Sequence, residues 1–198
     1  MRQTSDSIRC VYDESGYYVL NSILVFKKNS ERYSYKYIAA VLNSTLTDYL
    51  YKKLTQEEGR TFAEVKPANV RKLYIPKATR EEQDLLSILY DYLVFLKNPN
   101  QTDSFVSLNS MFIDLFEKII DGCVYELLFR EHMKEREIDI MSYLYQQIKP
   151  IEGLSDQDKN NIIISVHSNI FMTDNPARAR LKLFVSRSPE YLKPIIQH

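Results

Sequence analysis

The stretch "SYKYIAAVLNSTLTDYLYKK", residues 34–53, carries the clearest helical pattern in the chain. Its apolar side chains recur at spacings of three and four residues, as they do on one face of an α-helix. The stripe consists of Ile38, Val41, Leu42, Leu46, Tyr49 and Leu50, with the small side chain of Thr45 among them. Ser34 stands just before them and is a favourable N-cap. The stretch therefore predicts one amphipathic helix over residues 34–53.

The residues before this helix have the character of strands. "IRCVY" (8–12) and "YYVLNSILVFKK" (17–28) are rich in β-branched and aromatic side chains, and the turn signal "DESG" separates them. Such segments favour pleated, half-buried surfaces. We therefore expect a hairpin extended by a third strand.

The residues after the helix form a basic connector, "GRTFAEVKPANVRKLYIP" (59–76). It predicts a short strand, one helical turn begun by Pro67, and a second strand ended by Pro76. Thr79 and Glu82 then make a capping box, which begins a second long helix over about 80–97.

A linker, "NPNQTDS" (98–104), places the main boundary near residue 100. Beyond it the sequence predicts helices over 104–132 and 137–148, a third capped by Ser155 and Asp158, and one or two short helices after Pro176. The expected fold class is α+β: a small mixed β region with two long helices over residues 1–99, then a mostly helical extension over 100–198.

The net charge of the chain is zero, but its charges are segregated. Residues 52–77 hold seven bases and three acids, residues 101–158 five bases and twelve acids, and residues 159–198 six bases and two acids. A polyanion responds to such a local field rather than to the sum. The alternative is that each segment is a solvated helix face.

Catalytic patterns are lacking in the sequence. The three histidines have no partner at metal or triad spacing, and the four glycines are isolated. Cys10 and Cys123 suggest ordinary reduced thiols, with neither a disulfide framework nor a zinc site. No signal peptide or membrane span is visible, so the cytoplasm is the expected compartment. We expect no catalytic or metal-binding residues in this chain.

Three stretches in order resemble a known family: "YYVLNSILVFKK", "YKYIAAVLNSTLTDYLYKK" and "GRTFAEVKPANVRKLYIPKATREEQ". Their Leu-Asn-Ser (42–44), Ile-Pro (75–76) and Glu-Glu-Gln (81–83) elements resemble those of the C-terminal target-recognition region of TaqI-like DNA adenine methyltransferases and fused type II restriction-modification enzymes. "FEKIIDGCVYELLFREHMKE" (116–135) resembles the helical extension that follows this region.

The resemblance implies sequence-specific recognition of double-stranded DNA, with methyl transfer by an AdoMet-binding domain upstream or in a separate subunit. That domain's Asn-Pro-Pro-Tyr type motif has no copy here, so the chain is expected to be a fragment or a stand-alone specificity piece without its own cofactor. Two alternatives stay open: a type I specificity subunit, which shares the same short elements, and a helical interaction domain unrelated to DNA.

The resemblance assigns DNA contact to the basic connector and the end of the helix before it. The expected DNA-binding residues are Lys52, Lys53, Arg60, Lys66, Asn69, Arg71 and Lys72. The lysines would mainly neutralise phosphates. Arg60, Asn69 and Arg71 are the better candidates for base edges, because arginine pairs bidentately with guanine and asparagine with adenine. Ile75 and Pro76 are expected to be architectural.

Overall fold

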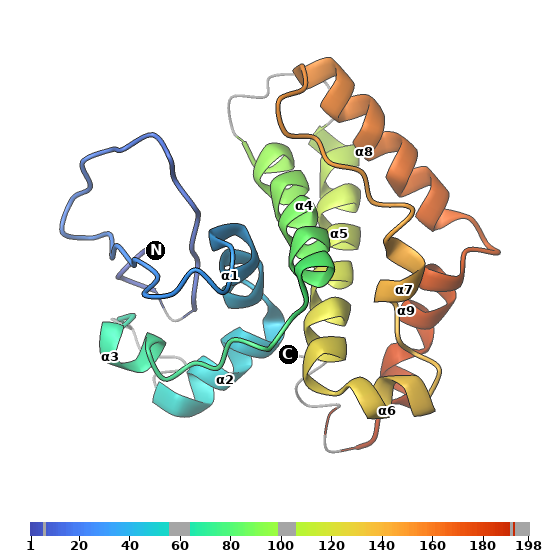
Figure 1. Ribbon diagram of the computed structural model, residues 1–198, viewed down its shortest axis with the longest axis horizontal. Coiled ribbons are helices and arrows are strands. Elements are labelled where there is room, and N and C mark those ends of the chain that lie inside the picture. Colours follow the sequence, from blue (N-terminus) through green and yellow to red (C-terminus); the bar gives the residue numbers. More distant parts are fainter. Residues whose placement is uncertain (6, 56–63, 99–105, 191, 193–198) are drawn as a thin grey trace.

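The computed structural model describes residues 1–5, 7–55, 64–98, 106–190 and 192, without the side chains of 106–108. This part of the chain is built from helices (Figure 1). They are α1 (Tyr35–Leu42), α2 (Thr45–Thr55), α3 (Pro67–Val70), α4 (Arg80–Leu96), α5 (Val106–Leu128), α6 (Arg130–Glu135), α7 (Met141–Leu144), α8 (Asp156–Phe171) and α9 (Pro176–Arg187).

Helix α4 is the central element, since it packs against α1 on one side and α5 on the other (Figure 1). Its Leu86, Leu89 and Tyr92 are fully buried. The Tyr92 ring meets that of Phe116 on α5 edge to face, with 5.1 Å between the ring centroids. One apolar core runs from Tyr37 on α1 to residues of α9. This core contains residues from both sides of residue 100. The predicted domain boundary there stays a prediction.

The local signals for helix starts are confirmed. Ser34 accepts a hydrogen bond from the Tyr37 amide at the start of α1. Thr79 and Glu82 form the expected capping box on α4. The Ser155 hydroxyl accepts the Asp158 amide at the start of α8, and the tail helix α9 begins at Pro176. Each of these signals depends on residues three or four positions apart, which is why sequence alone reveals them.

The predicted single helix over residues 34–53 is wrong, because it divides into α1 and α2 at Asn43 and Ser44. The Ser44 hydroxyl donates to the Val41 carbonyl at 2.7 Å, and that of Thr47 donates to the same oxygen at 2.7 Å. Such side-chain bonds compete with the helical backbone bonds. The Leu-Asn-Ser element is therefore the corner between two helices.

The predicted mixed β region is also wrong: within the described ranges there is no sheet, only two isolated bridges, Arg2 with Ile23 and Thr4 with Glu64. The extended segment 8–12 finds its backbone partners on helices instead. The amides of Ile8, Cys10 and Tyr12 donate to the side chains of Asp48, Asn43 and Tyr90, respectively. The Asn43 amide group also donates to the Cys10 carbonyl at 2.8 Å. Alternate residues thus dock on α1, α2 and α4 as they would on a neighbouring strand.

The second strand-like stretch stays exposed. Tyr17, Tyr18, Leu20 and Val25 are 76, 105, 78 and 76% exposed, although their apolar character predicted burial in a sheet. Propensity for strands measures fit to a pleated surface, and the described residues provide no such surface for this segment.

The Ile-Pro element is architectural, as expected. Pro76 is buried, and its carbonyl accepts a hydrogen bond of 2.8 Å from the hydroxyl of Tyr37 on α1. The predicted strand before Pro76 is absent, because residues 73–76 form neither a strand nor a β-bridge. This bond holds the chain against α1 shortly before α4 begins.

The C-terminal helices are shorter than predicted. The 104–132 helix breaks at Phe129, which separates α5 from α6. Of the predicted 137–148 helix only α7 forms. The buried carboxylate of Glu126 on α5 accepts the amides of Ile140 and Met141, at 2.6 and 2.9 Å, and so fixes the start of α7 after an extended segment. Burial raises the pKa of Glu126.

The Glu-Glu-Gln element of α4 contacts both α6 and the residues before α1. Glu82 on α4 receives two hydrogen bonds from the Arg130 guanidinium of α6, at 2.6 and 3.0 Å. Burial raises the pKa of Glu82, but the hydrogen bonds from Arg130 and the Thr79 amide outweigh it and hold the pKa below its ordinary value. The Gln83 side chain accepts the Ser34 amide and donates to the Arg32 carbonyl. The Glu-Glu-Gln element therefore has a structural role.

Candidate nucleic-acid interface

The short helix α3 is the centre of the predicted DNA-binding segment. Lys66 is its N-cap residue and Pro67 its first residue, as the sequence predicts. Proline is favoured there because its fixed φ suits the helix and its missing N–H has no intrahelical partner to lose. Val70 is buried, while Arg71 follows as the exposed C-cap residue.

Tyr51 of α2 holds the start of α3. Its ring is buried, and its hydroxyl donates to the Glu64 carbonyl at 3.3 Å and accepts the Lys66 amide at 3.2 Å. Tyr51, Ile8, Val65 and Val70 form a small second core beneath this region. A four-residue helix has little stability of its own, so these contacts determine its place.

The exposed cations of the segment surround α3. Lys66, Arg71 and Lys72 are exposed and lie within seven residues of one another. Asn69 is half-buried on the helix itself. Arg71 and Lys72 have no ion-pair partner within the described residues. This surface carries the positive charge that a phosphate backbone would meet.

The two lysines of α2 differ in their surroundings. Lys52 pairs with Asp48 one turn earlier, with 3.0 Å between nitrogen and oxygen, and its side chain is only 18% exposed. Part of its charge is therefore neutralised within the helix. Lys53 is exposed, and its ammonium lies 5.3 Å from the centre of the Tyr49 ring. Lys53 is thus better placed than Lys52 to reach a ligand.

The predicted residue Arg60 lies outside the described residues, so the structure gives no position for it. The six others are described, and their role in DNA binding stays a prediction.

Sequence reasoning missed a second set of cations near α3. Residues 1–4 lie between two segments: the Gln3 amide donates to the Ser22 carbonyl at 2.9 Å, and the Gln3 carbonyl accepts the Val65 amide at 2.7 Å. Exposed Arg2 thereby joins the region of α3, and exposed Lys27 follows the segment 22–24 that pairs with residues 1–3. No local signal reveals this arrangement, because these segments are distant from α3 in the sequence and only backbone hydrogen bonds join them.

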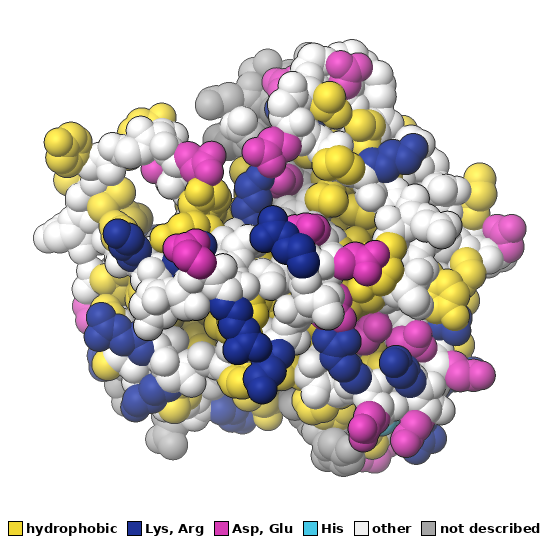
Figure 2. Space-filling model, in the orientation of Figure 1, with side chains coloured by type: hydrophobic (Ala, Val, Ile, Leu, Met, Phe, Trp, Pro, Cys, Tyr) yellow, Lys and Arg dark blue, Asp and Glu magenta, His cyan; other side chains and the backbone are white. Residues whose placement is uncertain are grey.

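The charge distribution is visible on the molecular surface. Figure 2 shows Lys and Arg side chains gathered over the part of the molecule where α2 and α3 lie, whereas Asp and Glu alternate with Lys and Arg over α6. Zero net charge thus coexists with a local positive surface.

A cleft of about 640 Å³ separates the N-terminal segment from α4 and α5. It is lined by Cys10, Asn43, Thr45, Tyr90 and Asp121, among others. Asp121 of α5 accepts the Thr45 amide at 2.9 Å and so caps the start of α2. Burial raises the pKa of this carboxyl to about 6, and the hydrogen bond from Thr45 opposes the rise.

The two cysteines and His167 are packed within the protein. Cys123 is fully buried in α5, and burial raises the pKa of Cys10 to about 11, so neither favours the thiolate form. His167 packs between Phe112 and Phe171, and burial lowers its pKa. No group of metal-ligating side chains occurs among the described residues. The described ranges likewise contain no helix with the length and apolarity that a membrane span requires.

Residues 1–75 match the family model of the TaqI-like C-terminal specificity domain. This part of the chain is similar to a TaqI-like specificity domain. The match extends from the N-terminal segment through α1, α2 and α3, and confirms the resemblance that the sequence suggested. No curated protein and no solved structure matches the chain.

The match to a specificity domain suggests a DNA-recognition module of restriction-modification proteins. The match includes the exposed cations around α3 and the Leu-Asn-Ser corner. The Glu-Glu-Gln element lies beyond it, at the start of α4, where its contacts join the specificity domain to the helices that follow.

Proposed function

We propose that this chain is the sequence-specific recognition module of a type II restriction-modification enzyme or an adenine-specific DNA methyltransferase. It positions double-stranded DNA for a catalytic domain or subunit that binds AdoMet and transfers the methyl group. One observation carries the proposal: the match to the specificity domain coincides with the surface where exposed cations gather around α3.

The residues around α3 divide by chemistry into two roles. Lys53, Lys66 and Lys72 are compact charges that suit phosphates, which supply affinity without sequence information. Arg71 and Asn69 have planar groups that pair bidentately with base edges. Lys52, paired with Asp48, has the smaller share of phosphate contact in this proposal. Arg60 is proposed for the same surface on its sequence position alone.

The acidic segment 101–158 is proposed to face away from DNA, towards the catalytic partner. The carboxylates of this segment repel DNA phosphates, whereas the cations around α3 attract them. This difference supports the orientation. Crosslinks from this segment to bound DNA would contradict it.

The experiment measures binding of the full chain to a random-sequence duplex by fluorescence anisotropy over a range of salt concentrations. Lys66→Ala with Lys72→Ala is expected to weaken binding to all sequences and to reduce the steepness of the salt dependence by about two phosphate contacts. Lys134→Ala, an exposed lysine of α6, is the matched control and is expected to change neither.

Arg71→Ala tests base readout on the same surface. Selection of bound sequences from the random pool is expected to show a relaxed preference, at a cost of about 1–3 kcal/mol for the preferred site. Unchanged affinity, salt dependence and preference in all of these variants would overturn the assignment of this surface.

A further inference from the structure

The exposed loop 13–21 stands on the same backbone scaffold as α3. Three segments form this scaffold, here called the basic frame: residues 1–4, residues 22–28, and residues 64–72 with α3. The Leu24 amide donates to the Met1 carbonyl at 2.7 Å, beside the bonds that join Gln3 to Ser22 and to Val65. Residues 1–4 thus connect the base of the loop to the segment that leads into α3.

The basic frame has the charge of a DNA-facing surface. It holds six cations and a single carboxylate, Glu64. The cations are Arg2, Lys27, Lys28, Lys66, Arg71 and Lys72. Lys28 is paired with Glu31, and the other five are exposed. The small core of Ile8, Tyr51, Val65 and Val70 supports the frame from beneath, with Leu24 and Leu73 packed against it.

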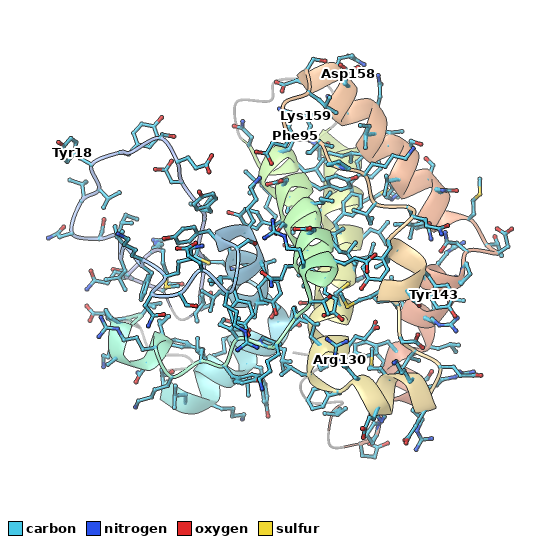
Figure 3. The ribbon with its side chains drawn as sticks, viewed as in Figure 1. Tyr18, Phe95, Arg130, Tyr143, Asp158 and Lys159 are labelled. Carbon is cyan, nitrogen blue, oxygen red and sulfur yellow. The ribbon has the colours of Figure 1, made fainter. Side chains whose placement is uncertain are left out.

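The loop is fixed at both ends but uncovered at its tip. At one end the Tyr12 amide donates to the Tyr90 hydroxyl at 2.8 Å, and at the other the Ser22 carbonyl is held by Gln3. Gly16, with a φ of +70°, turns the chain in a conformation that L side chains rarely adopt. Figure 3 shows Tyr18 at the far end of the loop, pointing away from the body of the molecule.

The tip therefore presents aromatic and apolar side chains beside a strongly positive surface. Tyr17, Tyr18 and Leu20 are 76, 105 and 78% exposed, and the stretch 15–26 contains no charged residue. Aromatic and apolar side chains pack on bases and wedge between base steps, while neighbouring cations hold the phosphates. A positive frame around an uncharged aromatic tip is complementary to a duplex rather than to an ordinary protein surface.

We infer that the loop tip, Tyr17–Leu20, is a second DNA-contacting element that packs on bases or sugars while α3 reads the adjoining part of the site. This inference rests on the proposed function and extends it to residues outside the basic connector. The loop contributes affinity by apolar and stacking contact, without adding positive charge.

The sequence contains no tryptophan, which provides a direct test. Tyr18→Trp places a single indole at the loop tip of the full chain. A random-sequence duplex is added at low salt, binding is followed by anisotropy of labelled DNA, and access to the indole is followed by acrylamide quenching. We expect bound DNA to reduce the quenching severalfold. Met172→Trp, at an exposed position after α8, is the matched control and is expected to stay accessible.

A second variant separates stacking from charge. Tyr17→Ser with Tyr18→Ser is expected to weaken DNA binding roughly tenfold while the steepness of the salt dependence is unchanged, because no charge is removed. If DNA binds while the indole stays fully accessible, or if the serine substitutions leave the affinity unchanged, the loop does not contact DNA. Either result would leave the assignment of the α3 surface unaffected. Loss of self-association in the serine variant with unchanged DNA binding would assign the loop to a protein interface instead. No anisotropy change with the parent chain would overturn the proposed function itself.

Discussion

Single side chains make the hydrogen bonds that fix the corners of this fold. Asn43 pairs with both backbone groups of Cys10, and Tyr37 donates to the carbonyl of Pro76. Each bond joins residues more than thirty positions apart. Short sequence elements such as Leu-Asn-Ser and Ile-Pro are thus explained by the backbone groups that they hold in place.

The Tyr37 hydroxyl provides a prediction at this scale. Tyr37 is fully buried, and burial raises its pKa far above its ordinary value, so it stays a donor. Tyr37→Phe removes the donor and leaves the Pro76 carbonyl unsatisfied in the core. We expect a loss of about 1–3 kcal/mol in the free energy of unfolding, measured with urea. Tyr35→Phe, at a half-buried tyrosine two residues earlier, is the control, and an equal effect of the two variants would contradict the prediction.

At the scale of elements, the helix caps could be predicted from sequence and the strands could not. The caps of α1, α4 and α8 depend on neighbours in the chain. The segment 8–12 has strand propensity, but Asp48, Asn43 and Tyr90 satisfy its amides, and nothing local announces such partners. In the candidate site, the pairing of Lys52 with Asp48 has a visible spacing of four residues, whereas the approach of Arg2 to the α3 region depends on long-range backbone pairing.

The contact between α2 and α3 provides a prediction at this scale. Tyr51→Phe removes the hydroxyl that bridges the Glu64 carbonyl and the Lys66 amide but keeps the buried ring. The start of α3 is expected to open more often, so the Lys66 amide should exchange with solvent roughly tenfold faster while amides within α2 are unchanged. Tyr74→Phe, at an exposed tyrosine nearby, is the control. Equal exchange of the Lys66 amide in both variants would rule out this anchoring role.

At the scale of the whole molecule, the C-terminal helices hold the specificity domain from outside it. Asp121 of α5 caps α2 through Thr45. Arg130 of α6 binds Glu82 on α4, and the next residue, Gln83, accepts the amide of Ser34 at the start of α1. The helix that carries Tyr51 and Lys53 is therefore oriented by a carboxylate that belongs to the extension. The C-terminal helices thus support the helix that carries part of the proposed DNA-binding surface.

Asp121 makes this support dependent on pH. Its pKa rises from 3.8 to about 6, chiefly because of burial and further through the nearby charge of Glu117. The folded state then holds the proton more tightly than the unfolded state, so this group lowers stability as the pH rises from about 4 to 6. Asp121→Asn keeps an oxygen for the Thr45 amide without the ionisation. We expect the variant to be more stable than the parent above pH 6, by about 3 kcal/mol at most, and the difference to diminish towards pH 4. Urea unfolding across this range measures it, with Asp114→Asn at an exposed position of α5 as the control. A difference between Asp121→Asn and the parent that is constant with pH would show that the carboxyl does not titrate in this window.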